Sequence, residues 1–316
     1  MPEGRRLVGY ALAVLAGCLW ALLVVLGKLL VATGVDPVTM VGVRAAMAFI
    51  MLGGVLAVVN RRLITLEAGD IPLFLGYGSC VALNYALYFY AFKYTTGTMA
   101  VILMYTYPAF VTGLAAALLG ERLDAVKVTA LFVTLAGCVL VVQAYDRGAL
   151  LFNLKGVLSG LGSALAMALY SIIGKTAIRR YNSWTVVLWG FGFGSLLLLG
   201  SRLGDLGAVA RMPPEVWGGL FLVALFPTLL AYAVFTRAMV YIEASRASIT
   251  ASVEPVVGAA LAWVFLGERL ETLQWLGGVA VIGGVLILQA GDLRRDSARS
   301  RAGRPTGAAA GPPPGG

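Results

Sequence analysis

The chain contains no histidine and few charged residues, with Asp, Glu, Lys and Arg making up 12% of its 316 positions. A water-soluble domain carries roughly twice that share of charge, so the composition excludes an ordinary soluble globule. Without histidine, the chain lacks the commonest general base and metal ligand, which weakens any enzymatic interpretation. Its three cysteines, Cys18, Cys80 and Cys138, lie in apolar stretches and form neither a metal-ligand spacing nor a disulfide framework.

What the sequence has instead is apolar surface. Hydrophobic residues make up 60% of the chain, and the mean hydropathy is +0.89. The apolar residues form runs of about 20, long enough to cross the roughly 30 Å hydrocarbon layer as helices. The sequence therefore predicts an all-α integral membrane protein in the lipid bilayer, with ten transmembrane helices. The predicted spans are 7–31, 37–59, 71–92, 97–119, 126–143, 154–174, 184–201, 215–236, 246–266 and 271–290.

The net charge of +9 does not indicate a nucleic-acid partner, because the cations flank the apolar runs or lie in the tail. Basic loops are instead typical of the cytoplasmic side of a membrane protein. With ten spans, sixteen Lys and Arg fall on the side of both termini and six on the other, which predicts cytoplasmic termini in a bacterial-type plasma membrane. Residues 292–316 are rich in Arg, Ser, Pro and Gly, and this composition predicts a disordered basic cytoplasmic tail.

The chain repeats itself at an offset of 147 residues. A proline-bearing span that begins near Pro108 ends in Gly-Glu-Arg-Leu at 120–123, and a second begins near Pro255 and ends in the same four residues at 267–270. The repeats, predicted as 1–150 and 151–291, hold five spans each. Because five is odd, the second repeat enters the membrane from the opposite side. This is an inverted-topology repeat, an architecture that many secondary transporters use.

These motifs resemble the EamA family of the drug/metabolite transporter (DMT) superfamily. The resemblance rests on the two five-helix halves, on Gly-Glu-Arg-Leu after each proline-bearing fourth span, and on Glu254-Pro255 in the ninth span. It covers roughly residues 5–291. It implies a ten-helix carrier with its cavity between the halves, often one that exports amino acids or related metabolites. The motifs do not specify the substrate.

Glu254 is the first candidate for chemistry, because it lies near the middle of the ninth span. A charged side chain at that depth costs at least roughly 2.5–3.5 kcal/mol, so we expect Glu254 to face the interior of the bundle. Three roles fit: a proton-coupling site, a partner for a substrate ammonium group, or a buried structural acceptor. Pro255, like Pro108 in the first repeat, removes a backbone donor and predicts a hinge or kink.

Four further residues are candidates for substrate binding or coupling. Tyr107 corresponds to Glu254 in the first repeat, and it either contacts a ligand or fills the core. Tyr88 is either a residue of the interfacial aromatic belt or an inward one, whereas Asn84 lies too deep in the third span for a belt position. Arg44 lies well inside the second span, where it snorkels outward, pairs with an acid, or binds a substrate carboxylate.

The two Gly-Glu pairs are more easily explained as structural than as catalytic. We expect Gly120 and Gly267 to end their helices, and Glu121 and Glu268 to cap the dipole of the helix that follows. The sequence thus offers no catalytic residue and no metal site, and no cofactor is expected.

Together, these features favour a secondary active transporter for a small metabolite, with export inferred from the resemblance. No nucleotide-binding motif is present, so transport would be driven by an ion gradient or by the gradient of the solute itself. One alternative is a non-transporting membrane scaffold or channel subunit, which would have no need of Glu254 or Asn84 at depth. The other is an integral membrane enzyme, for which the chain lacks a cluster of catalytic groups. The substrate, the coupling ion and the oligomeric state stay open.

Overall fold

The computed structural model describes residues 3–26, 36–145, 153–267 and 269–302. Within these ranges every regular element is a helix. Nine helical segments are long and apolar enough to cross a membrane, and the shorter apolar helix 125–141 occupies the place of a tenth. The prediction of an all-α membrane protein with ten spans is therefore confirmed, and the span boundaries agree to within about five residues.

The helices follow in chain order, with the fourth, eighth and ninth spans divided into shorter pieces. They are α1 (Glu3–Ala21), α3 (Pro37–Val59), η1 (Arg61–Leu63), η2 (Ala68–Asp70), α4 (Ile71–Tyr94), α5 (Gly97–Met104), α6 (Tyr107–Leu119), α7 (Ala125–Val141), α8 (Leu154–Ala177), α9 (Ser183–Gly200), η4 (Leu203–Asp205), α10 (Leu206–Ala210), α11 (Pro214–Val223), η5 (Ala224–Leu230), α12 (Ala231–Tyr241), α13 (Ala244–Ala251), α14 (Glu254–Leu266) and α15 (Thr272–Ala302).

Several spans begin at a side chain that satisfies a free backbone donor. Asp36 accepts a hydrogen bond from the N–H of Thr39 at the start of α3, and Asp124 accepts one from the N–H of Lys127 at the start of α7. Asn153 caps α8 in the same manner. These acceptors explain why the helices begin at those residues, since the first N–H groups of a helix have no partner inside it.

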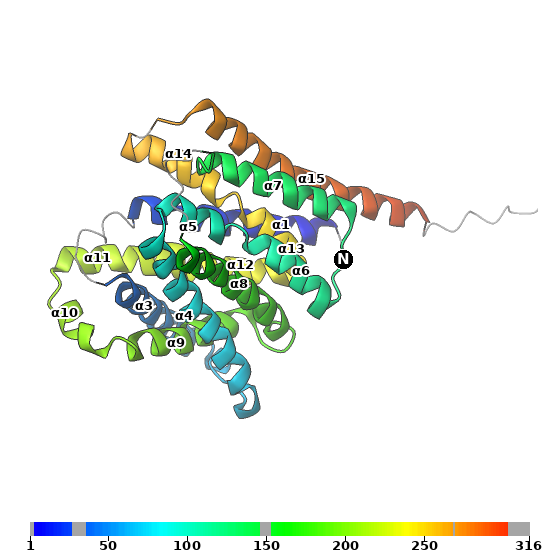
Figure 1. Cartoon of the computed structure of the whole chain (residues 1–316). Coiled ribbons are helices and arrows are strands. Elements are labelled where there is room, and N and C mark those ends of the chain that lie inside the picture. The colour runs from blue at the N-terminus through cyan, green and yellow to red at the C-terminus, as the bar shows by residue number, and fades with distance from the viewer. Residues whose placement is uncertain (1–2, 27–35, 146–152, 268, 303–316) are drawn as a thin grey trace, which may run out of the picture.

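The two repeats interlock, with the first span of each against the third span of the other. Helix α1 packs on α12, and α8 packs on α4. Corresponding spans also meet directly: α3 contacts α9, and α7 lies along α15 on one side of the bundle (Figure 1). Gly137 of α7 and Gly277 of α15 face each other so closely that a Cβ on either would lie 2.7 Å from the other's carbonyl oxygen. Small residues thus let two spans approach closely where lipid provides no hydrophobic drive.

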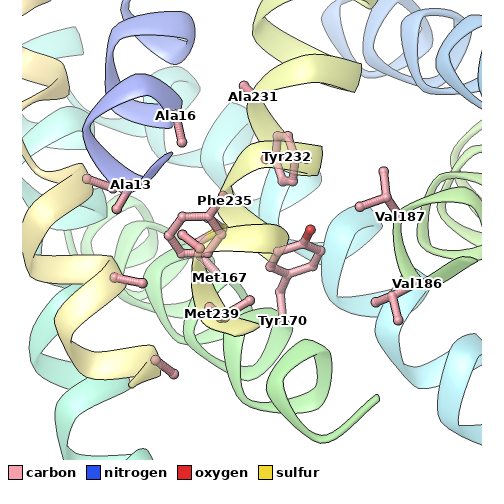
Figure 2. Close-up of a cluster of buried hydrophobic side chains, with 14 of the residues drawn as sticks. Ala13, Ala16, Met167, Tyr170, Val186, Val187, Ala231, Tyr232, Phe235 and Met239 are labelled. Carbon is pink, nitrogen blue, oxygen red and sulfur yellow. The ribbon is translucent and has the colours of Figure 1, made fainter. Parts of the chain in front are cut away.

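The centre of the bundle is filled by aromatic side chains. Tyr170, Tyr232 and Phe235 gather with alanines of α1 and with Val186 and Val187 of α9 (Figure 2). Tyr170 also stacks on Tyr77 of α4, with 4.4 Å between the ring centroids. Tyr77 is completely buried, so it is not a residue of an interfacial belt.

The fourth and ninth spans are both broken near their middle. The fourth consists of α5 and α6, separated at Tyr105 and Thr106, and the ninth consists of α13 and α14, separated at Ser252 and Val253. In each case the second half begins one residue before a proline, which has no N–H to continue the ladder of the first half. The two prolines therefore mark full interruptions of the helix, where the sequence predicted a hinge or kink.

The eighth span is irregular as well, because η5 forms a π-helical turn around Pro227 between α11 and α12. At the far end of the chain, α15 continues as a helix through residues 292–302. Those residues belong to the segment for which disorder was predicted, whereas 303–316 lie outside the described residues.

Candidate functional site

Glu254 is the first residue of half-helix α14, at the break of the ninth span. Its carboxylate is partly buried and hydrogen-bonded to the hydroxyl of Tyr105, which lies at the corresponding break of the fourth span. Tyr88 of α4 lies close enough to interact with it electrostatically, as do Tyr107 and Cys138. An acid at this position also meets the positive end of the α14 dipole. Glu254, the acid at mid-span in the part of the chain that the structure describes, thus lies at the break of the ninth span, close to Tyr105 at the break of the fourth span and to Tyr88 of α4.

Tyr107 occupies the same position in α6 that Glu254 occupies in α14. It is buried, and its hydroxyl donates to the carbonyl oxygen of Ser248 at 3.2 Å. Ser248 belongs to α13, so Tyr107 ties the broken fourth span to the broken ninth span. Glu254, Tyr88 and Tyr107 are therefore brought together, and their role in binding or coupling stays a prediction.

Arg44 of α3 forms a second polar group with two tyrosines. Its side chain is 7% exposed, and the guanidinium lies over the ring of Tyr85, 4.6 Å from the ring centroid. The Tyr85 hydroxyl is hydrogen-bonded to the hydroxyl of Tyr232 at 2.8 Å. Arg44 does not snorkel, and no acid among the described residues forms an ion pair with it.

Asn84 joins two helices instead of facing Glu254. Its amide group donates to the carbonyl oxygen of Ser163 at 3.0 Å and to the Ser163 hydroxyl at 3.1 Å. The same hydroxyl donates back to the carbonyl oxygen of Asn84 at 2.9 Å. The side chain is 5% exposed, so these bonds connect α4 to α8 inside the bundle. A polar side chain inside the hydrocarbon layer needs such partners, because no water is available there to form its hydrogen bonds.

Gly120 and Gly267 end α6 and α14, each with a φ of 69°. Glycine reaches this left-handed conformation at no steric cost. Glu121, however, does not cap the helix that follows it, because Asp124 already caps α7. Its carboxylate accepts instead from the backbone N–H of Ala244 at 2.8 Å and from the N–H and hydroxyl of Ser245. Glu268 lies outside the described residues.

Glu121 thereby caps α13, a helix of the other repeat. The expected capping role was assigned to the wrong helix, because sequence order gives no sign that the start of α13 lies beside the end of α6. The two half-helices pack against each other at this point. No interface of comparable size joins α5 and α14 within the part of the chain that the structure describes.

Charged side chains surround this contact in an arrangement that we call the ionic cluster. Lys127 is fully buried and lies 2.9 Å from Glu243 and 3.5 Å from Glu121. Arg246 lies 2.7 Å from Glu243 and 3.5 Å from Asp124. Burial alone would raise the pKa of Glu243, but Lys127 and Arg246 outweigh it, so its pKa lies below the ordinary value.

Lys127 and Arg246 were among the sixteen cations assigned to the cytoplasmic side from the sequence. In the structure both are buried and form ion pairs. The predicted site residues did not include Tyr85 and Tyr105. A signal for Tyr85 was present, since Tyr232 follows it at the repeat offset of 147. Among the described residues, no group of three or more His, Cys, Asp or Glu side chains is placed to hold a metal ion.

The fold and the site together define a polytopic helical membrane transporter built from two five-helix repeats. The sequence profile of the EamA-like transporter family matches residues 7–143 and 154–289, which is most of the chain in two parts. The chain therefore belongs to the EamA-like transporter family, as its motifs suggested.

Relatives in archaea and bacteria bear transporter names. The chain is 31% identical over 206 residues to an "uncharacterized transporter" of Archaeoglobus fulgidus, covering 65% of this chain and 72% of that protein. It is 26% identical over 219 residues to the pseudopaline exporter CntI of Pseudomonas aeruginosa, covering 69% of this chain and 75% of CntI. A crystal structure that is 19% identical has the same fold, with a TM-score of 0.75 over 94% of this chain and 99% of the other.

Proposed function

We propose that this protein is a secondary active transporter that exports small amphipathic metabolites, such as amino acids, by alternating access between its two repeats. The single observation that carries the proposal is the pair of broken spans. Transporters bind their solutes where discontinuous helices meet near the bilayer midplane. Here the break of the ninth span lies at Glu254, close to Tyr105 at the break of the fourth span, and among the described residues the larger interface between the two broken spans is the one between α6 and α13.

Unequal contact at the two ends supports alternating access. Half-helices α6 and α13 are held together by Glu121 and by the ionic cluster, while α5 and α14 share no interface of comparable size among the described residues. In the transport cycle, the first contact opens when the second forms. With both termini in the cytoplasm of a plasma membrane, as the Lys and Arg distribution favours, the ionic cluster closes the cytoplasmic side. Reporter fusions near Asp36 and after Ala302 check this orientation.

Glu254 is the proposed coupling residue. A carboxylate that is partly buried at a helix break can exchange a proton with one side of the membrane at a time, and Tyr105 moves with the other broken span. Relatives named as exporters support outward transport, and an export carrier of this kind would exchange its solute for protons. The exporter name of CntI supports the direction, and it does not set the substrate.

The test is transport by the purified full chain in liposomes, with and without an imposed pH gradient. Labelled metabolites are screened first on the wild type. We expect Glu254→Gln to lose the response to the pH gradient while exchange of solute down its own gradient continues. Glu254→Asp should recover part of the response. Glu215→Gln is the matched control, because Glu215 is an exposed acid at the start of α11.

Two outcomes would contradict the proposal. An unchanged pH response in Glu254→Gln would remove Glu254 as the coupling residue. Failure of the wild type to move any solute, in a preparation that is folded and correctly inserted, would contradict the transport function itself.

A further inference from the structure

Arg44 is a buried cation that lacks an acidic partner in the part of the chain that the structure describes. Its Nε atom is buried without a hydrogen-bond partner, and its guanidinium has one described interaction, the face of the Tyr85 ring. Tyr232 lies near enough to interact electrostatically with the Arg44 guanidinium. A ring face compensates a buried charge only in part, since cation–π attraction is weaker than a charge-assisted hydrogen bond.

The fold itself does not require a charge at this place. Position 191 corresponds to position 44 at the repeat offset, and it holds Phe191. Phe191 packs edge-on against Tyr232, with 5.4 Å between the ring centroids. Arg44 contacts Tyr85, the counterpart of Tyr232, but lies over the face of its ring. An apolar ring therefore fills the equivalent space in the second repeat without any cost of burying charge. The guanidinium at position 44 needs an explanation other than packing.

The surroundings of Arg44 indicate what it would bind. A guanidinium presents N–H donors in a planar fork that matches a carboxylate. The contact with the Tyr85 ring and the burial of the side chain restrict the guanidinium in advance, so less conformational freedom is lost on binding. Tyr85 is in turn held by the Tyr232 hydroxyl. Tyr88, which lies beside Glu254, is three residues further along α4 and so on the neighbouring turn.

We propose that Arg44 is the anchor for the carboxylate of a small carboxylic-acid solute, held over Tyr85 at the interface of the two repeats. The proposal rests on the transport function proposed above and narrows its substrate class. It places the carboxylate over Tyr85, one turn of α4 from Tyr88, the tyrosine that interacts with Glu254, so that Arg44 and the coupling acid act on the same solute.

Binding is measured on the purified full chain in detergent, separately from transport. The probes are L-amino acids, 2-hydroxy acids and dicarboxylic acids, each compared with its primary amide. The amide keeps the shape and removes the negative charge. We expect at least one acid to bind the wild type and raise its melting temperature, while its amide binds at least about tenfold more weakly, the ratio for losing a charge-assisted hydrogen bond.

Three variants locate the effect. Arg44→Gln should weaken binding of the acid by about tenfold or more and leave its amide unchanged. Arg44→Lys should give an intermediate loss, because it keeps the charge and loses the fork. Arg237→Gln is the control, since Arg237 also lies over a tyrosine, 5.3 Å from the Tyr241 ring centroid, but is exposed. It should bind as the wild type does.

The proposal is overturned if no acid binds better than its amide, or if Arg44→Gln binds the acid as tightly as the wild type. If Arg44→Gln does not fold, Arg44→Lys and the acid-to-amide ratio of the wild type decide the matter. Acid binding that depends on Arg44 without pH-driven transport would leave this assignment standing and contradict the coupling role of Glu254. Transport that depends on Glu254 but does not distinguish acid from amide would support the coupling role of Glu254 and contradict the assignment of Arg44 as a carboxylate anchor.

Discussion

The two broken spans have corresponding half-helices at both ends, α6 and α13 at one and α5 and α14 at the other, but the described residues at the two ends differ in charge. Where α6 meets α13, Asp124, Glu243 and Arg246 belong to the ionic cluster. At the repeat offset, their counterparts are Glu271, Thr96 and Met99. Of these only Glu271 is charged, and its carboxylate is exposed and accepts from the hydroxyl of Tyr145 at 2.8 Å. The two ends therefore have corresponding half-helices, but among the described residues ion pairs join the half-helices only where α6 meets α13.

This difference bears on the energetics of alternation. If both ends were equivalent, the two facing states would be equally stable and the breaks alone would set the exchange between them. An ionic lock at one end instead favours the state in which that end is closed. Four changes test this asymmetry and the contacts near the breaks and at the centre of the bundle, and the largest effect is expected at Glu121.

Replacing Glu121 by Ala should destabilise the protein by about 3–5 kcal/mol, as when one partner of a buried ion pair is removed. It leaves buried Lys127 short of one acid and the N–H groups of Ala244 and Ser245 without an acceptor. Reversible unfolding in mixed micelles measures the loss. Glu271→Ala is the control at the other end and should cost under about 1 kcal/mol, as for an exposed polar group. Equal losses at the two ends would mean that there is no asymmetry.

Replacing Gly17 by Val should cost about 1–3 kcal/mol, because overpacking a close helix contact has that effect. Gly17 of α1 faces the break of the ninth span, where a Cβ would lie 2.6 Å from the carbonyl oxygen of Ala251. The melting temperature and solute transport are both measured. Gly54→Ala serves as the control, since an added Cβ there meets no atom within 4 Å. An unchanged melting temperature and unchanged transport in Gly17→Val would show that close packing of α1 does not hold the break between α13 and α14 in place.

Replacing Tyr85 by Phe, or Tyr232 by Phe, should cost about 0.5–1.5 kcal/mol each, the usual net contribution of a hydrogen bond. The two hydroxyls share one bond, so the double variant should cost clearly less than the sum of the single ones. A double-mutant cycle on unfolding free energies measures this coupling. Strict additivity would mean that the hydroxyls do not bond across the repeats.

The smallest effect concerns pH at Glu243. Its pKa is lowered in the folded protein, so its ion pairs stabilise the protein above its unfolded pKa, and this stabilisation is lost as pH falls through the folded pKa. The stability of the closed end should thus be insensitive to pH from neutral down to about the ordinary glutamate pKa near 4.3, and should fall only below it. Melting curves of the wild type and Glu243→Gln across this range should converge at the acid end. A difference that stays constant with pH would contradict the assignment.

Sequence periodicity predicted the spans well because hydrocarbon permits few alternatives to a continuous apolar helix. The offset of 147 likewise showed the repeat and the importance of the two prolines. The contacts between repeats were harder to predict. That Glu121 would cap α13, or that Asn84 would be satisfied by Ser163, depends on how helices far apart in sequence come together. Lys127 could not be predicted for the same reason. A cation near the end of a span is usually a loop residue, and only the fold shows that Glu121 and Glu243 lie beside this one.

The bond between Tyr85 and Tyr232 has a consequence for the ancestry of the fold. A residue that lies on a two-fold axis meets its own copy, so it must be self-complementary. Two carboxylates or two guanidinium groups would repel there, whereas a hydroxyl both donates and accepts and can bond to an identical hydroxyl. The pair thus meets the requirement for a homodimer of unfused, oppositely inserted five-helix chains. In the single chain the two tyrosines have different neighbours, Arg44 beside Tyr85 and Phe191 beside Tyr232, so the symmetry of the pair does not extend to its surroundings.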